Sequence, residues 1–180
     1  MGDWPSYPSI AASMPTISAY GPCGSLASVG NPGTPVSGTW TAANRAVYLP
    51  IRLGRLYTVR LMWAINGAVV AGNVDIGLYD EGGRALFTNG PVAQVGINAP
   101  QSFAVSPVVN IVAGLYYIAL WESSTTATFF RGSSLLVDQT TIIGHATQDG
   151  LVAGLPANIT RAVPATAHIP VFGISSRSTI

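Results

Sequence analysis

Short β-prone segments recur through the middle of this chain, and this recurrence limits the possible fold more than any other feature. Runs of β-branched and aromatic residues bounded by Gly, Pro, Asn and Ser are typical of strands. Such segments cover residues 46–53, 56–65, 73–79, 84–88, 101–105, 108–112, 115–121 and 125–131. We therefore expect an all-β fold, a jelly-roll-like antiparallel β-sandwich.

One candidate helix interrupts this pattern, at residues 134–143. Its last four residues are Thr140, Thr141, Ile142 and Ile143, which disfavour a helix because β-branched side chains lose rotamer freedom there. No internal repeat of the length of a solenoid or propeller unit is visible, so a repeat fold is not expected.

Residues 73–79 show the cleanest alternation of apolar and polar side chains. Successive side chains of a strand point to opposite faces. We therefore expect Val74, Ile76 and Leu78 to point into the core. The other face would carry Asn73, Asp75, Gly77 and Tyr79.

The segment 115–121 is the most β-prone of the chain, and both of its faces are apolar. Parity places Tyr117 and Trp121 on one face. The opposite face carries Tyr116, Ile118 and Leu120. One of these sets is expected in the core, and the other is then free to face a partner.

The two ends of the chain differ in composition from its middle. Residues 1–44 are rich in Pro, Gly, Ser and Thr, which predicts an extended N-terminal arm. The sandwich core is expected in residues 45–131. Residues 132–180 are loop-rich but carry many apolar side chains, so we expect them to pack on the core or on a neighbouring subunit.

Charged side chains are scarce. They make up 8% of the 180 residues, while hydrophobic residues make up 48%; ordinary soluble domains carry about 25% charged residues. This composition excludes a disordered chain. The eight basic and seven acidic groups leave much of the surface apolar. Such a surface is typical of a subunit of a larger assembly.

The basic residues are all arginines and are scattered along the chain. Nucleic-acid binding requires a basic stripe, so no nucleic-acid partner is expected. The lack of lysine excludes a P-loop and Schiff-base chemistry. The single cysteine, Cys23, excludes an internal disulfide.

No residue pattern indicates a catalytic or metal site, and we expect neither an enzyme nor a bound cofactor. The two histidines, His145 and His168, fit no metal-binding motif. Paired carboxylates could hydrolyse glycosides, with Asp75, Asp80, Glu81 and Glu122 as the candidates. Oxygen ligands for calcium could come from Asn73, Asp75, Asp80 and Glu81. Structural roles are preferred for all of them, because acidic residues are common in turns and the spacing matches no calcium loop.

A candidate interaction surface comes from aromatic and polar side chains, since Trp and Tyr combine a large apolar ring with a polar group. The N-terminal region contributes Trp4, Tyr7, Tyr20 and Trp40. The polar face of the segment 73–79 contributes Asn73, Asp75 and Tyr79.

Neither secretion nor membrane insertion is expected. The first residues lack the basic region and the apolar core of a signal peptide. The long charge-free stretches contain Gly and Pro, which a membrane-spanning helix of about 20 apolar residues does not tolerate at this density.

Several turn-and-strand motifs resemble a set of small β-sandwich proteins encoded in the genomes of tailed bacteriophages. The motifs are WTAANRAVYLP at residues 40–50, NGA at 66–68, GNVDIGLYD at 72–80, AGLYYIAL at 113–120, TATFFR at 126–131, LPA at 155–157 and IPVFGI at 169–174. The resemblance covers residues 40–175. It implies a virion structural role and no catalytic residues.

This resemblance and the composition together predict a virion structural protein, assembled in the host cytoplasm, that decorates or reinforces the capsid or the tail. Its partners would be the major capsid or tail protein and further copies of itself, with a trimer as the expected oligomer. A tail module that binds host-surface glycans is the alternative. A polysaccharide-degrading enzyme is the second alternative.

Overall fold

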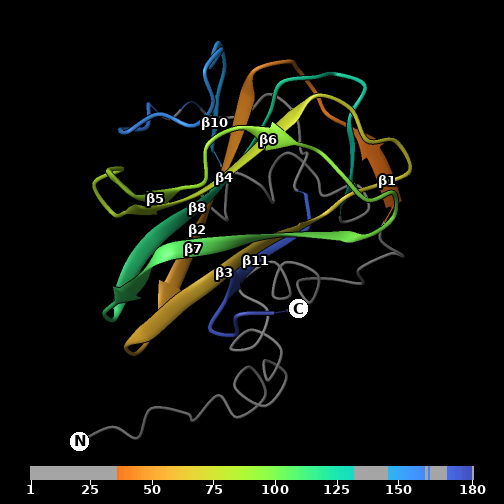
Figure 1. Cartoon of the computed structure of the whole chain (residues 1–180). Helices are drawn as coiled ribbons and strands as arrows, with labels where there is room; N and C mark the ends of the chain where they lie inside the picture. The colour runs from red at the N-terminus through yellow and green to blue at the C-terminus, as the bar shows by residue number, and fades with distance from the viewer. Residues whose placement is uncertain (1–35, 132–145, 161, 163–169, 180) are drawn as a thin grey trace, which may run out of the picture.

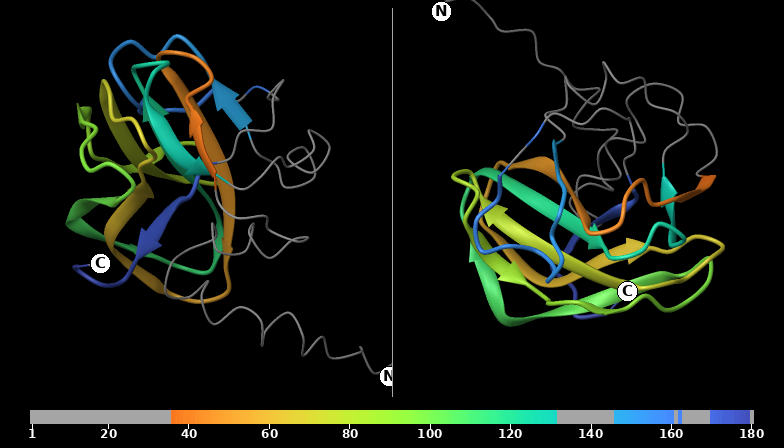
Figure 2. Two further views of the ribbon diagram at one scale, coloured as in Figure 1. Left: turned by 90° about the vertical axis from the view of Figure 1, so that its right-hand side faces the viewer. Right: turned by 90° about the horizontal axis from the view of Figure 1, so that it is seen from above.

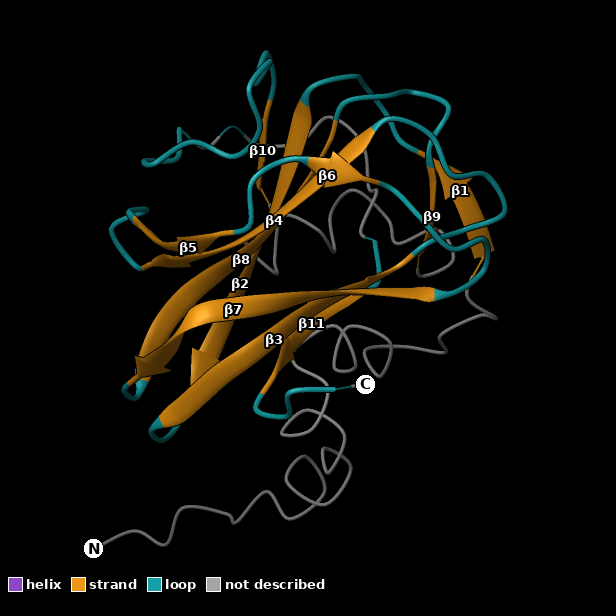
Figure 3. Cartoon of the chain, viewed as in Figure 1, coloured by secondary structure: helices purple, strands orange, loops and turns teal. Residues whose placement is uncertain are grey.

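The computed structural model describes residues 36–131, 146–160, 162 and 170–179, and all regular structure within them is β-strand (Figure 3). The candidate helix at 134–143 lies outside the described residues. The strands are β1 (Val36–Thr39), β2 (Arg45–Leu53), β3 (Tyr57–Ile65), β4 (Asn73–Asp80), β5 (Ala85–Thr88), β6 (Val92–Ala93), β7 (Pro100–Ile111), β8 (Gly114–Glu122), β9 (Thr128–Arg131), β10 (Ala146–Gln148) and β11 (Phe172–Ser175).

These strands form two main antiparallel sheets (Figure 1). The large sheet has the order β10-β2-β8-β4-β5, with β6 also paired to β4, and the small sheet has the order β11-β3-β7. A two-stranded ribbon of β1 and β9 completes the described structure. Two further views show the two main sheets as the layers of a sandwich (Figure 2). The expected all-β antiparallel sandwich is confirmed.

The core between the sheets follows from the alternation of the sequence. Val74, Ile76 and Leu78 of β4 are fully buried, as predicted. They pack with inward residues of the other strands in one apolar cluster, which includes Val47, Leu49, Ile51, Met62, Phe103, Ile118, Leu120, Phe172 and Ile174. Burying one such aliphatic or aromatic side chain stabilises the fold by roughly 1.5–3 kcal/mol.

Strand β7 is continuous where the sequence predicted two segments separated by Pro107. The pairing with β3 shifts between two registers, from Val59 opposite Val109 to Leu61 opposite Ala104. The additional residues of β7 bulge out at this shift and include the exposed Pro107. A bulge leaves residues outside the ladder, so the missing N–H of Pro107 costs no ladder hydrogen bond.

Both flanking regions contribute to the sandwich where they are described. In the N-terminal region, β1 pairs with β9, and the buried Trp40 ring packs edge-on against Phe129 at 5.2 Å between ring centroids. In the C-terminal region, β10 extends the large sheet and β11 extends the small sheet. The described part of residues 132–180 therefore packs on the core of its own chain.

Candidate functional site

The structure corrects the predicted interaction surface. Trp40, Asp75 and Tyr79 are each no more than 2% exposed, because other parts of the chain cover them. A partner cannot touch them without a rearrangement of the chain. Asn73, at the start of β4, is exposed as expected. The remaining candidates, Trp4, Tyr7 and Tyr20, lie outside the described residues.

The outer face of the large sheet carries a layer of aromatic side chains, which we call the outer aromatic layer. It consists of Tyr48, Tyr79, Tyr117 and Trp121, with small residues Ala46, Ala119 and Ala146 between them. Leu151, Leu155 and Ile159 pack against it from the segment 149–160. The parity of β8 was predicted correctly, but both of its faces are buried inside this chain, so neither is free for a partner.

Polar bonds attach the segment 149–160 to the outer aromatic layer. The Tyr79 hydroxyl donates to the carbonyl of Pro156 at 2.8 Å. The Tyr48 hydroxyl donates to Oε1 of Gln148 in β10 at 3.0 Å, and the same oxygen accepts the Thr160 N–H of the segment at 3.0 Å. The Tyr48 ring packs edge-on against that of Tyr79. Burial raises the pKa of both tyrosines. Both hydroxyls therefore remain protonated and keep their role as donors.

Asp75 lies on this outer face and is 1% exposed. Its Oδ2 accepts the backbone N–H of Leu155 at 2.9 Å, whereas its Oδ1 has no hydrogen bond of normal geometry. Burial raises the pKa of Asp75, and the N–H of Leu155 opposes this shift most strongly. Trp121, its cross-strand neighbour, also has an unpaired ring nitrogen. Asp75 thus anchors the segment 149–160. It lies on the face that alternation predicted, but that face is covered by this segment.

Close packing at Asp75 requires a glycine in the covering segment. Gly154 has φ of +96°, and a Cβ there would lie 2.9 Å from Oδ2 of Asp75 and 2.7 Å from Pro91. A larger residue at 154 would be strained in its backbone and would push the segment away from the sheet.

Glu122 ends β8 and is fully buried. Its Oε1 accepts the Ser124 N–H at 3.0 Å and the Ser123 hydroxyl at 3.4 Å, but its Oε2 has no partner. Burial raises the pKa of Glu122 to about 7, against the opposing effect of the bonds from Ser124 and Ser123. Glu122 therefore changes charge near neutral pH in a place that solvates charge poorly.

Three buried amide side chains form what we call the amide network: Asn66, Gln94 and Gln101. Asn66 Nδ2 donates to Gln101 Oε1 at 3.1 Å, and Gln94 Nε2 donates to Asn66 Oδ1 at 3.1 Å. The remaining bonds reach the backbone of Ala71, Ala93, Val95 and Thr128. Every side-chain oxygen and nitrogen of the three amides has a partner, so the network fixes the loops around it.

Two loops held by the amide network expose a group of aliphatic side chains, which we call the loop patch. It consists of Val69 (47% exposed), Val92 (39%), Val95 (57%) and Ile97 (60%). The loops lie side by side, because Asn98 N–H donates to the Gly67 carbonyl at 2.9 Å and Gln94 N–H to the Gly72 carbonyl at 3.2 Å. Large apolar side chains are thus presented on a fixed backbone.

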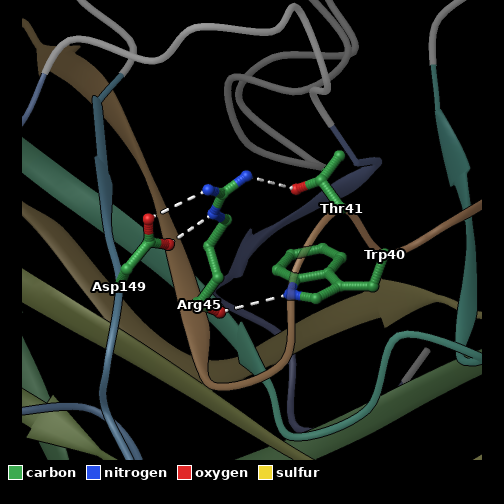
Figure 4. A network of polar contacts seen from close by, with 4 residues as sticks. All are labelled: Trp40, Thr41, Arg45 and Asp149. Carbon is green, nitrogen blue, oxygen red and sulfur yellow. Dashed lines mark hydrogen bonds and ion pairs between the residues drawn. The ribbon is translucent and has the colours of Figure 1, made fainter.

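A polar clamp at the start of β2 joins three segments (Figure 4). The guanidinium of Arg45 binds both carboxylate oxygens of Asp149, with Nη2 and Oδ2 2.9 Å apart, and donates to the Thr41 hydroxyl at 2.8 Å. The Trp40 indole N–H donates to the Arg45 carbonyl at 3.2 Å. Arg45 lowers the pKa of Asp149 by hydrogen bonding. The clamp fixes the beginning of the segment 149–160 next to β2.

The carboxylates expected as possible catalytic or calcium-binding groups do not form one site. Asp75 in β4 pairs with Trp121 in β8, and both side chains lie on the outer face of the sheet. Glu122 follows Trp121 in β8 and therefore lies on the inner face. Asp80 accepts the Arg84 N–H at the β4–β5 turn, which is the structural role preferred for it. Among residues 36–131, 146–160, 162 and 170–179, no three His, Cys, Asp or Glu side chains gather as they would around a metal ion. His145, His168 and Cys23 lie outside the described residues.

No helix that could cross a membrane occurs in the described part of the chain. No protein-family model, curated protein or solved structure matches this chain.

The amide network and the carboxyl of Glu122 with its raised pKa were not recognised from the sequence. Asn and Gln in turns are common, and nothing local distinguishes a buried amide from an exposed one. Glu122 ends an apolar strand, and parity with Leu120 was the one signal that could have placed it inside.

Proposed function

We propose that this chain is a structural protein of a tailed-phage virion that decorates or reinforces the capsid or tail. In this proposal it is a jelly-roll-like sandwich with arms at both ends, and it acts through contacts with copies of itself, as a trimer, and with other virion proteins. The resemblance of the turn-and-strand motifs to those of small phage β-sandwich proteins supports the proposal.

The observation that carries the proposal is the loop patch. Four aliphatic side chains are 39–60% exposed on two neighbouring segments, one of which includes strand β6. Exposed large apolar side chains that occur close together on neighbouring segments are typical of surfaces that bind other proteins. The loops are fixed by the amide network, and a surface that is already ordered loses little conformational entropy when it binds. A preformed apolar contact surface suits a permanent place in an assembly.

The glycan-binding alternative loses the surface on which it rested. Two of its three residues on β4, Asp75 and Tyr79, are covered by the segment 149–160, so they cannot converge on a sugar with Asn73 in this arrangement. A glycan array on the purified chain tests this alternative, and specific glycan binding would contradict the proposal of a purely structural role.

Self-association through the loop patch can be tested by comparing a variant of the patch with a variant of an exposed side chain elsewhere. Val95→Asp combined with Ile97→Asp places two charges in the patch, and Val152→Asp places one at a side chain that is 81% exposed on the segment 149–160. In analytical ultracentrifugation we expect the unmodified chain and Val152→Asp to form the same oligomer, and the double variant to be a monomer. An unmodified chain that stays monomeric at all concentrations, or a double variant that assembles normally, would contradict this mode of assembly.

The virion location needs a separate experiment. Mass spectrometry of purified particles should find the chain at a fixed ratio to the major capsid or tail protein, and negative-stain images with a labelled chain should show where it lies. If purified particles lacked the chain while infected cells contained it, the proposal would be contradicted.

A further inference from the structure

Two connections cross the same end of the sandwich side by side, at the lower left of Figure 1. One runs from Leu53 in the large sheet to Tyr57 in the small sheet, and the other returns from Ile111 to Gly114. Leu53 pairs with Gly114, and Tyr57 pairs with Ile111. The two connections are therefore paired with each other at both of their ends, and residues 54–56 lie beside residues 112–113.

Arginines gather at this end of the molecule, which we call the arginine corner: Arg52 in β2, Arg55 in the first connection, Arg60 in β3 and Arg177 just after β11. Arg177 belongs here because Ser175, two residues earlier, pairs with Leu61 and so places it beside the beginning of β3. All four side chains are exposed. They are four of the seven arginines in the described part of the chain.

No acidic side chain among the described residues forms an ion pair with this corner. Four of the five described acids are engaged elsewhere: Asp149 with Arg45, Asp80 with Arg84, and Asp75 and Glu122 inside the protein. The fifth, Glu81, lies in the β4–β5 turn. In a protein with so few charges, four positive groups without an ion pair to any described acid give this end a strong local field.

Two large aliphatic side chains are exposed at the same end of the sandwich, one on each connection. Leu56 is 66% exposed and Val112 is 65% exposed. They flank the paired residues Tyr57 and Ile111 and so lie opposite each other across the two connections. This end of the sandwich thus combines two exposed aliphatic side chains with four exposed guanidinium groups, and arginine is enriched in protein–protein interfaces.

We infer that the arginine corner binds an acidic surface of another protein, with an apolar side chain of the partner seated between Leu56 and Val112. Guanidinium groups match carboxylates in charge and in the spacing of their two hydrogen bonds. The inference goes beyond the proposed virion role, because it depends on the charges and exposure of this chain alone.

Nucleic acid and anionic lipid are less suitable occupants. A phosphodiester backbone would neutralise the arginines but would leave Leu56 and Val112 uncovered. A lipid surface attracts basic side chains more strongly when they come in a larger, continuous cluster. An acidic protein surface satisfies both components of the corner.

The probe for the test is a synthetic peptide in which glutamates flank leucines, and its control is the same peptide with glutamine in place of glutamate. Fluorescence anisotropy with the full chain should show binding of the acidic peptide that weakens as salt is added. Arg52→Gln with Arg55→Gln should weaken it at least about tenfold, while Arg84→Gln, which removes the same kind of charge at the β4–β5 turn, should change it less than about twofold. Leu56→Ser should also weaken binding, and Val152→Ser should not.

Several outcomes would overturn the inference. One is that the acidic peptide does not bind. Another is that Arg84→Gln weakens peptide binding as much as the Arg52→Gln and Arg55→Gln variant does, which would indicate non-specific attraction to positive charge. Tighter binding of duplex DNA or of phosphatidylglycerol vesicles than of the peptide would assign the corner to a different occupant. The substituted side chains are exposed, so unchanged melting temperatures serve to confirm that the variants fold.

Discussion

The two faces of the large sheet are both buried, but by different means. The inner face packs aliphatic side chains against a second sheet that is itself held by strand pairing. The outer face is covered by the segment 149–160, which contacts its neighbours through separate hydrogen bonds and the isolated bridge from Arg84 to Asn158. Separate bonds hold the outer cover, and no strand within 149–160 pairs along a ladder, so the cover should open at a lower free energy than the sandwich unfolds.

The largest effect is expected on the inner face. Ile76→Ala removes a fully buried side chain from the centre of β4 and leaves a cavity, which should lower the free energy of unfolding by about 2–5 kcal/mol. Urea unfolding followed by tryptophan fluorescence measures this loss, with Val152→Ala as the exposed control. A neutral Ile76→Ala would contradict the register of β4 described here.

Glu122, the carboxyl at the end of the inner face, should make stability depend on pH. Its pKa is raised from 4.5 to about 7 in the folded chain, so its stabilising contribution is complete below pH 4.5 and is lost as the pH rises to about 7. Glu122→Gln carries no charge and should be more stable than the unmodified chain at pH 8, by up to about 3 kcal/mol. At pH 4 the difference should vanish. Melting curves at both pH values test this, and equal stability at pH 8 would show that the charge is well solvated.

Asp75 should affect the cover more than the sandwich. Asp75→Ala leaves the Leu155 N–H without an acceptor in a buried place, which should cost about 1–3 kcal/mol. Amide hydrogen exchange should speed up at Leu155 and its neighbours but not in β3 or β7. Asp75→Asn is the matched control, because it keeps an acceptor for the Leu155 N–H. It also removes a carboxylate whose ionised form is disfavoured by burial, as the raised pKa of Asp75 shows. This variant should therefore be no less stable than the unmodified chain at neutral pH. Uniformly faster exchange in Asp75→Ala would show that the two faces unfold together.

The smallest effect is expected at Tyr79, which bonds to Pro156 in the segment 149–160. Tyr79→Phe keeps the ring and removes the hydrogen bond to the Pro156 carbonyl, which should cost about 0.5–1.5 kcal/mol. Limited proteolysis should cut within 149–160 sooner than in the unmodified chain. Tyr48→Phe, which loses a bond to Gln148 in β10 just before the segment, provides a comparison of similar size. If cleavage were unchanged in both variants, apolar contacts and not these hydrogen bonds would keep the segment 149–160 in place.

The inner face could be predicted because its signal is local. Alternation within β4 identified Val74, Ile76 and Leu78 as core residues, and parity within β8 grouped Tyr116, Ile118 and Leu120. A side chain that points inward in a strand has its environment set by the strand itself, so a window of a few residues contains the information.

The outer face could not be predicted in the same way. Alternation shows that Asp75 and Tyr79 share a face, but it does not show what covers that face. The cover includes Leu155, which is 80 residues from Asp75 in the sequence. The amide network failed for a similar reason, because its members come from three connected loops and strands whose contacts depend on the completed fold.

The position of Asn66 before Gly67 bears on how this protein ages. An Asn–Gly pair in a flexible turn deamidates when the glycine nitrogen attacks the asparagine side chain, one of the reactions that make asparagine thermolabile. Here the Asn66 side chain is fully buried and bonded at both ends, and the Gly67 N–H donates to the Thr128 carbonyl at 2.8 Å. The native fold thus holds the nucleophile away from its target. Isoaspartate at residue 66 would record episodes of local unfolding, so its slow accumulation would measure how long each molecule has spent open.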